Sequence, residues 1–430
     1  MEKAFQRSRF PRPLRWSVIS SGILAVTTVV VALWCVRRAM HRMKLFDAIR
    51  RHDEGPRPYA QPDFLYLNAS ARPGVEAIRA TLEDWFSRYP RAGRAELRSR
   101  FRSNNLDHRS AFFELFLHEL MLRLGCKIRL HPQLPATTRR PDFVVTSQNG
   151  ERFYLEAVLA TDQSKEEMAA EARKNQVYDS INKLNSPDFY IGMDVRGEPA
   201  TPPSGKTIRT FLAKRLGQLN RDEVGKLFEE GGFPALPHWR YEHNGWTIDF
   251  FPFPKSGDAL GKTGVRPIGI QFEGFKWIET KVAIRNAILE KAGRYGKLLQ
   301  PYVIAVNVFS DHLDDTDVIE ALFGDERLIY STGTPQPQAP RLGRSANGVW
   351  DSPSGPKNTR VSSVLIFDHL SQSNIPWVTP CLYHNPWAAI PYRGPLNQLR
   401  RGVVANNKME YSDGQVLSAL FGLPNDWPGK

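Results

Sequence analysis

The sequence predicts an α/β protein whose mixed sheet is flanked by helices, and two patterns lead to this prediction. Residues 110–125 are apolar nearly all round, which indicates a buried helix of about four turns. Residues 142–145 and 153–158 are rich in β-branched and aromatic side chains, and Asn149-Gly150 lies between them. This combination predicts a β-hairpin, because Asn-Gly adopts the tight turn that joins two antiparallel strands.

Strands and helices continue to alternate after the hairpin. We expect helices at 208–219 and 284–298, and strands at 189–195, 268–272, 302–307 and 361–367. Residues 239–253 are expected to form a strand, or a hairpin that turns at Asn244-Gly245. The chain of 430 residues is expected to consist of a basic N-terminal segment with an apolar stretch (1–44), the first part of a core (45–196), an insertion (197–280), the second part of that core (281–330) and a loop-rich C-terminal extension (331–430).

Three carboxylates lie in elements that are otherwise almost wholly apolar. Glu114 lies on the apolar helix, Asp142 begins the first strand of the hairpin, and Glu156 lies in the second strand. A buried carboxylate is costly unless it is paired or binds a metal ion. The hairpin can place Asp142 and Glu156 side by side, and oxygen ligands in this arrangement suit Mg²⁺ or Mn²⁺.

Simpler interpretations stay open for two of these acids. Glu114 can be a helix acid paired with Arg109 or Arg123, and Asp142 can be a turn residue that follows a proline. Residues 91–102 form a basic segment just before the apolar helix. This segment either contacts a nucleic-acid backbone or is a solvated helix face.

A helix glutamate, Pro-Asp, a hairpin and a second acid, in this order, resemble the PD-(D/E)XK nuclease superfamily, which has the restriction-endonuclease-like fold. The resemblance covers residues 110–158. It implies that Asp142 and Glu156 bind the metal ion and that Glu114 supports the site. In that superfamily a lysine two positions after the second acid positions the attacking water. Here Val158 stands at that position, so the motif is E-x-V in place of E-x-K.

Two lysines elsewhere in the chain can replace the missing one. Lys174 lies on a segment whose apolar residues recur at helical spacing. Lys291 lies on a second such segment, and Tyr295 follows it in a K-x-x-x-Y pattern before a strand, which resembles the helix motif of RecB-type members of the superfamily. We favour Lys291, and the expected catalytic set is therefore Glu114, Asp142, Glu156 and Lys291.

The resemblance implies a metal-dependent nuclease that cleaves phosphodiester bonds, with Mg²⁺ or Mn²⁺ as cofactor and nucleic acid, DNA first, as partner. The net charge of +13 favours a polyanionic partner, either nucleic acid or an anionic membrane surface. The alternative function is that of a catalytically inactive relative, which binds nucleic acid or acts as a membrane-tethered interaction protein. The sequence contains no P-loop, no zinc-finger spacing and no Cys-x-x-Cys pair, which argues against ATP use and zinc-based reading of DNA.

The N-terminal segment leads to a separate expectation. Residues 16–36 carry no charged side chain and are long enough to span a bilayer as a helix. We therefore expect a single-pass membrane anchor with the rest of the chain in the cytoplasm. The alternative is that residues 1–42 are an over-extended reading frame and that Met43 is the true start of a cytoplasmic protein.

Overall fold

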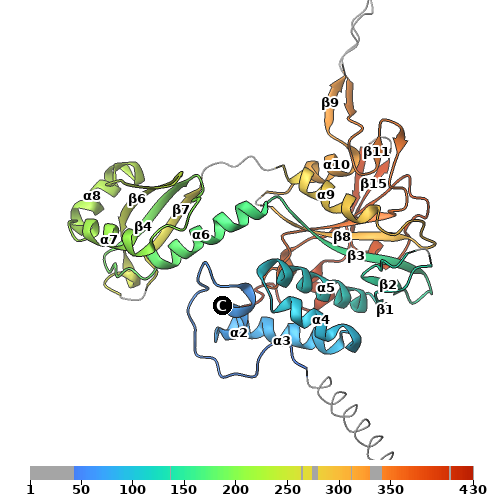
Figure 1. Cartoon of the computed structure of the whole chain (residues 1–430), viewed down its shortest axis with the longest axis horizontal. Coiled ribbons are helices and arrows are strands. Elements are labelled where there is room, and N and C mark those ends of the chain that lie inside the picture. Colours follow the sequence, from blue (N-terminus) through green and yellow to red (C-terminus); the bar gives the residue numbers. More distant parts are fainter. Residues whose placement is uncertain are drawn as a thin grey trace, which may run out of the picture.

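The computed structural model shows a main body and a separate lobe (Figure 1). The body is built on an eight-stranded sheet, and the lobe is built on a four-stranded sheet. The structure describes residues 43–135, 137–262, 265–273, 279–310, 312–329, 341–405 and 408–429.

The eight-stranded sheet has the order β1-β2-β3-β8-β13-β14-β15-β16. Its three central strands, β3, β8 and β13, run parallel, whereas β1, β2 and β3 pair antiparallel. The predicted α/β class with a mixed sheet is therefore confirmed. The strands are β1 (Lys127–Leu130), β2 (Phe143–Thr146), β3 (Arg152–Thr161), β8 (Tyr302–Phe309), β13 (Ser363–Asp368), β14 (Cys381–His384), β15 (Arg400–Ala405) and β16 (Lys408–Ser412).

Helices cover both faces of this sheet, each over its own hydrophobic core. One face packs against helices from the N-terminal part and from the C-terminal end, namely α2 (Asp63–Ala69), α3 (Pro73–Arg88), α4 (Arg91–Phe101), α5 (Asn105–Arg123) and α11 (Leu417–Phe421). The other face packs against α9 (Thr280–Ala292) and α10 (Asp315–Phe323). Successive residues of a strand point to opposite faces, so each central strand contributes alternate side chains to both cores.

Helix α5 corresponds to the buried helix predicted at 110–125. It begins earlier than predicted because the Asn104 side chain accepts a hydrogen bond from the backbone N–H of Asp107 and caps the first turn. It ends at Arg123, and Gly125 adopts a φ of 75° just beyond it. The helix is buried nearly all round because it lies between the sheet and the other N-terminal helices.

Strands β2 and β3 form the predicted hairpin. Phe143 lies opposite Leu155, and the pairing continues to Thr146 opposite Arg152. Gly150 adopts a φ of 83° in the turn, a conformation that glycine reaches without steric cost.

The lobe lies beside the body, and α6 leads into it from the end of β3 (Figure 1). Its sheet order is β5-β6-β4-β7. The lobe contains two clusters of buried apolar side chains of its own. Its elements are α6 (Lys165–Ile181), β4 (Phe189–Arg196), α7 (Gly205–Leu216), α8 (Arg221–Gly231), β5 (Trp239–His243), β6 (Trp246–Pro254) and β7 (Ile268–Glu273).

Two of the expected boundaries differ from the structure. The insertion was expected to begin at residue 197, but α6 and β4 already belong to the lobe, because β4 pairs with β6 and β7 and α6 packs on the same sheet. Residues 331–430 were expected to form a loop-rich extension. Within the described part of this range, β13 to β16 instead provide half of the strands of the main sheet.

Two small antiparallel pairs and four 3₁₀ helices complete the described structure. The pairs are β9 (Glu326–Ile329) with β10 (Arg341–Arg344) and β11 (Asp351–Ser352) with β12 (Gly355–Pro356). The 3₁₀ helices are η1 (Phe233–Ala235), η2 (Gly257–Ala259), η3 (Ile375–Trp377) and η4 (Pro395–Gln398).

The expectation of a single-pass membrane protein is corrected. Among the helices of the described residues, none is both long enough and apolar enough to cross a membrane. Residues 16–36, on which that expectation depended, lie outside the described residues, as does the whole of 1–42.

Candidate functional site

The hairpin and helix α9 bring three of the predicted site residues together. The Lys291 ammonium donates a hydrogen bond to Oε1 of Glu156 over 2.9 Å. The backbone N–H of Asp142 donates to Oε2 of Glu156 over 3.2 Å, and the N–H of Ala157 donates to Oδ2 of Asp142 over 2.8 Å. The two acids predicted to lie side by side therefore do so, and the lysine comes from a helix on the neighbouring layer.

Local structure explains this placement. The pairing of Phe143 with Leu155 puts the preceding residue, Asp142, beside Glu156 at the start of the hairpin. Helix α9 packs over this strand through a core that includes Ile284 and Ile288. The last turns of α9 then reach the Glu156 carboxylate, whose side chain is only 1% exposed.

Two further residues of the α9 segment contact Glu156. The hydroxyl of Tyr295 donates to Oε2 of Glu156 over 2.7 Å. The Arg294 guanidinium lies 3.5 Å from Oε1. Tyr295 is part of the K-x-x-x-Y pattern in the sequence, whereas Arg294 belongs to none of the predicted motifs. Both residues lie in the turn just after α9, which ends at Ala292, so helical spacing from Lys291 does not by itself place them beside Glu156.

Asp142 lies in a desolvated environment that disfavours its ionised form. Burial, the Glu156 carboxylate and the Glu114 carboxylate raise the pKa of Asp142 to about 7. Burial and the same Glu156 carboxylate also raise the pKa of Tyr295, so its phenol stays protonated as a donor. Asp142 and Glu156 offer carboxylate oxygens of the kind that Mg²⁺ and Mn²⁺ bind, while Lys291, Arg294 and Tyr295 already contact the Glu156 carboxylate.

Glu114 is buried on α5, but protein groups occupy both of its oxygens. The hydroxyl of Tyr89 donates to Oε1, and the Arg100 guanidinium donates to Oε2. The partner expected for a simple ion pair was Arg109 or Arg123, whereas the structure supplies Arg100. Among the described contacts, Glu114 influences Asp142 through its charge and makes no direct hydrogen bond to it.

A second group of possible metal ligands consists of Glu96, Glu114 and His131. One ligand atom from each lies within 4.8 Å of the others. The Arg100 guanidinium, however, donates to both carboxylates, with 2.5 Å and 3.2 Å to the oxygens of Glu96. A fixed positive charge already neutralises this pair, so we assign no cation to the group.

Lys174 lies in the lobe, away from the two acids. Its ammonium is 2.6 Å from a carboxylate oxygen of Glu171 and 3.7 Å from one of Glu273. The side chain is buried, as its place on an apolar helix face predicted, but that face packs on the lobe sheet. Of the two candidate lysines, Lys291 is the one that contacts Glu156.

Much of the basic segment 91–102 is engaged within the protein. Arg94 donates to the backbone oxygens of Tyr89 and Ser87. Arg98 donates to the backbone oxygen of Lys44. These contacts indicate that the segment has a structural role. They argue against the interpretation that its arginines are free to bind phosphates.

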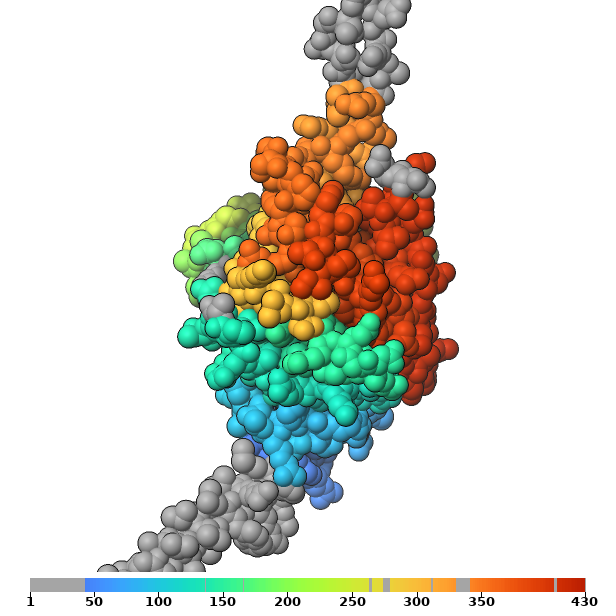
Figure 2. Space-filling model, turned by 90° about the vertical axis from the view of Figure 1, so that its right-hand side faces the viewer, coloured from blue at the N-terminus to red at the C-terminus, as the bar shows by residue number. Residues whose placement is uncertain are grey.

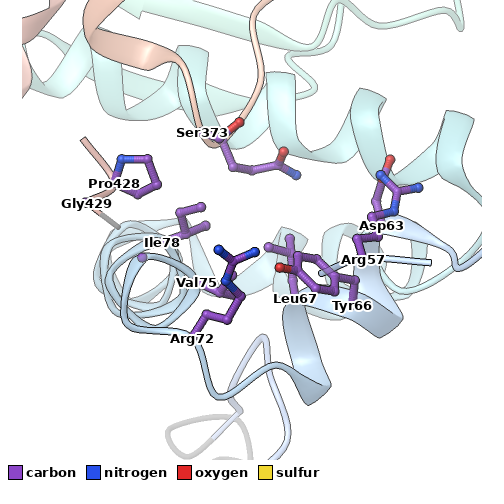
Figure 3. A pocket seen from close by; sticks show the side chains of 12 residues that line it. Arg57, Asp63, Tyr66, Leu67, Arg72, Val75, Ile78, Ser373, Pro428 and Gly429 are labelled. Atoms are coloured by element: carbon purple, nitrogen blue, oxygen red, sulfur yellow. The ribbon is translucent and has the colours of Figure 1, made fainter. Parts of the chain in front are cut away.

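The pocket shown in Figure 3 is separate from this site. It has a volume of about 380 Å³ and lies between α2, α3, residues 372–373 and the C-terminal residues 428–429. Its polar lining includes Arg57 and Asp63, which form an ion pair with each other. None of the predicted catalytic residues lines it.

Comparisons with protein families, with curated proteins and with solved structures found no match.

Proposed function

We propose that this chain is a metal-dependent nuclease that hydrolyses phosphodiester bonds in nucleic acid. The observation that carries the proposal is the contact between Lys291 and Glu156 beside Asp142, since it supplies the lysine that the motif lacks at position 158. The order of elements also supports a restriction-endonuclease-like arrangement: a helix with a buried acid, the β2/β3 hairpin, and then β8 parallel to β3. The lobe is an insertion between the hairpin and α9.

In this proposal, Asp142 and Glu156 hold the cation. A divalent cation bound there supplies Lewis acidity and lowers the pKa of a bound water. Tyr295 fixes the Glu156 carboxylate through its hydroxyl. The Lys291 ammonium has three N–H donors, and Glu156 accepts one of them, so the others can orient a water and contact a phosphate oxygen.

The alternative is a nucleic-acid-binding protein that has lost catalysis. One observation favours it: both Lys291 and Arg294 already place positive charge on Glu156. A carboxylate neutralised in this way has less attraction for a metal ion. Cation binding thus separates the two functions, because a binding protein needs no cation at the two acids.

The test uses the full chain with plasmid, linear duplex DNA, single-stranded DNA and RNA, each with Mn²⁺, Mg²⁺ or EDTA. We expect metal-dependent cleavage that Asp142→Ala and Lys291→Gln abolish. Lys174→Gln is the matched control, since it removes the buried lysine of α6 in the lobe and leaves Lys291 in place. Absence of cleavage on every substrate, together with no binding of Mn²⁺ by calorimetry, would contradict the nuclease and favour the alternative.

A further inference from the structure

Strands β9 and β10 form a two-stranded arm that projects from the body. Figures 1 and 2 show the arm extending away from α10 and from the rest of the main body. The strands pair antiparallel, with Leu328 opposite Leu342 and Ile329 opposite Arg341. Neither strand joins the main sheet or the lobe sheet. Among its described residues, Arg327, Leu328, Arg341 and Leu342 are exposed.

The two faces of the arm differ in chemistry. Leu328 and Leu342 share one face and are 53% and 69% exposed. Arg327 and Arg341 lie on the opposite face, because they alternate with the leucines along their strands. Both arginines are exposed, and neither has an ion pair or hydrogen bond with another described residue. The arm thus presents exposed leucines on one face and two positive charges on the other.

The root of the arm is fixed to the helix that carries Lys291. Arg285 donates to Oδ1 of Asp325 over 3.1 Å, and the Lys281 ammonium lies 3.2 Å from the same oxygen. Arg344 donates to the backbone oxygen of Gly324 over 3.0 Å. Arg285 precedes Lys291 by six residues, which is about 9 Å along a helix. The arm and the catalytic lysine thus share one rigid support.

We propose that the β9/β10 arm binds duplex DNA by entering the major groove. This proposal rests on the proposed nuclease function only for the claim that the bound duplex is the substrate. The major groove of B-DNA is about 12 Å wide and admits a two-stranded ribbon, whereas the major groove of an RNA duplex is too narrow. Arg327 and Arg341 would contact phosphates, and the leucines would contact apolar edges such as thymine methyl groups.

Charge distribution supports the arm over the lobe as the duplex-binding element. Residues 165–273 carry 15 Lys and Arg and 15 Asp and Glu, so the lobe has no excess positive charge. The arm carries three arginines and one acid, Glu326, which lies 3.6 Å from Arg344 near the root. A polyanion is therefore attracted to the arm and not to the lobe as a whole.

The test measures binding without cleavage. The full chain carries Asp142→Ala in EDTA, and fluorescence anisotropy reports its affinity for a labelled DNA duplex at several salt concentrations. We expect R327Q/R341Q to weaken binding at least about tenfold and to reduce the slope of log K against log salt by about 1.8, the value for two phosphate contacts. The matched control, K206Q/K214Q, removes two exposed charges from α7 and should leave the slope nearly unchanged.

A second variant tests the apolar face. We expect L328S/L342S to weaken binding while the salt slope stays the same, because the leucines release no counterions. The thermal unfolding midpoint should be retained in all variants, since the arm lies outside the main cores. Equal loss in the K206Q/K214Q control, equal arm-dependent binding to an RNA duplex, or no binding by the parent protein would overturn the proposal. Failure of the nuclease would show instead in the separate cleavage assay.

Discussion

Lys291 and Glu156 are 135 residues apart in the sequence, yet the lysine ammonium lies 2.9 Å from the glutamate carboxylate. Val158 follows Glu156 on the same face of β3 and packs against the core under α9. Position 158, where the motif has its lysine, is thus covered by α9. Lys291 of that same helix contacts Glu156. In the E-x-K motif the lysine that lies beside the second acid comes from the same strand, whereas here it comes from a helix.

This relationship predicts that the lysine can be moved back to the strand. We expect Lys291→Gln to lower the cleavage rate at least about 100-fold, the range seen when a proton-transfer or positioning group is removed. Adding Val158→Lys should recover at least about tenfold of that loss, since position 158 faces the same layer as Glu156. Single-turnover cleavage of duplex DNA measures both effects. Val158→Met, which keeps the length without the charge, is the control, and equal recovery by methionine would contradict the role of the ammonium.

The raised pKa of Asp142 predicts a pH-dependent affinity for the cation. Burial and the neighbouring carboxylates raise that pKa to about 7 in the absence of a metal ion. A cation binds the ionised carboxylate, so affinity falls as the pH drops below 7 and levels off above it. We expect Mn²⁺ binding at pH 6 to be about tenfold weaker than at pH 8, which corresponds to the change in the ionised fraction.

Calorimetry at the two pH values in buffers of different ionisation enthalpy measures both the affinity and the proton release. Asp142→Asn provides the control, because an amide does not titrate. A Mn²⁺ affinity that stays constant between pH 6 and pH 8 would argue against Asp142 as a ligand.

The parts of the site that sequence reasoning found are those set by local structure. The Asn149-Gly150 turn specifies the hairpin, and the hairpin alone determines that Asp142 lies beside Glu156. Helical periodicity also predicts that Lys291 faces inward, and its side chain is only 14% exposed. Periodicity does not say which surface a helix face packs on, however, and Lys174 shows this, because its equally apolar face lies on the lobe sheet.

The features of the fold and of the site that the sequence did not predict depend on contacts between segments distant in the chain. The sequence of β4 would suit a strand of the main sheet as well as one of the lobe sheet. Only its pairing with β6 assigns it to the lobe. Strand β13 lies between β8 and β14 in a parallel and an antiparallel register that no local signal indicates. The contact of Arg100 with Glu114 likewise requires the packing of α4 on α5. The sequence therefore does not predict that Arg100 is the partner of this acid.

The lowered pKa of the buried His118 predicts that the protein loses stability in mild acid. The side chain is 2% exposed, its Nδ1 atom has no hydrogen-bond partner, and burial together with Arg88 lowers its pKa to about 4. The unfolded state has the ordinary pKa of about 6.5 and binds the proton first, so stability is full above pH 6.5 and falls as the pH drops toward 4. Between pH 7.5 and pH 5 the free energy of unfolding should fall by about 2 kcal/mol through this residue.

Urea unfolding of the full chain at the two pH values measures the effect, and His118→Gln is the comparison. The variant is expected to be less stable at pH 7.5 but to lose about 2 kcal/mol less on acidification. An equal loss in both proteins would show that other groups account for the acid sensitivity.

The carboxylate of Asp179, on α6 of the lobe, binds a segment of the body, and this contact leads to a prediction about how the lobe is held. Its carboxylate accepts the backbone N–H groups of Tyr59 over 2.7 Å and Ala60 over 2.8 Å, and Tyr59 packs edge-on against Tyr178 of α6. Arg266, just before β7, donates to the backbone oxygen of Pro56 over 2.7 Å. Residues 56–60 of the body thus form a strap across two elements of the lobe.

Loss of the Asp179 carboxylate should release this strap while both cores stay folded. A hydrogen bond to a charged group contributes about 1.5–3 kcal/mol, so Asp179→Ala should speed amide exchange at Tyr59 and Ala60 by roughly 10- to 150-fold. Hydrogen exchange with mass spectrometry measures this, and Asp222→Ala, at an exposed acid of α8, is the control. If the strap amides exchange at the parental rate, the packing of Tyr59 and the Arg266 contact hold the lobe without the carboxylate. Global exchange of the β4 and β6 amides would mean instead that the lobe itself needs Asp179 to fold.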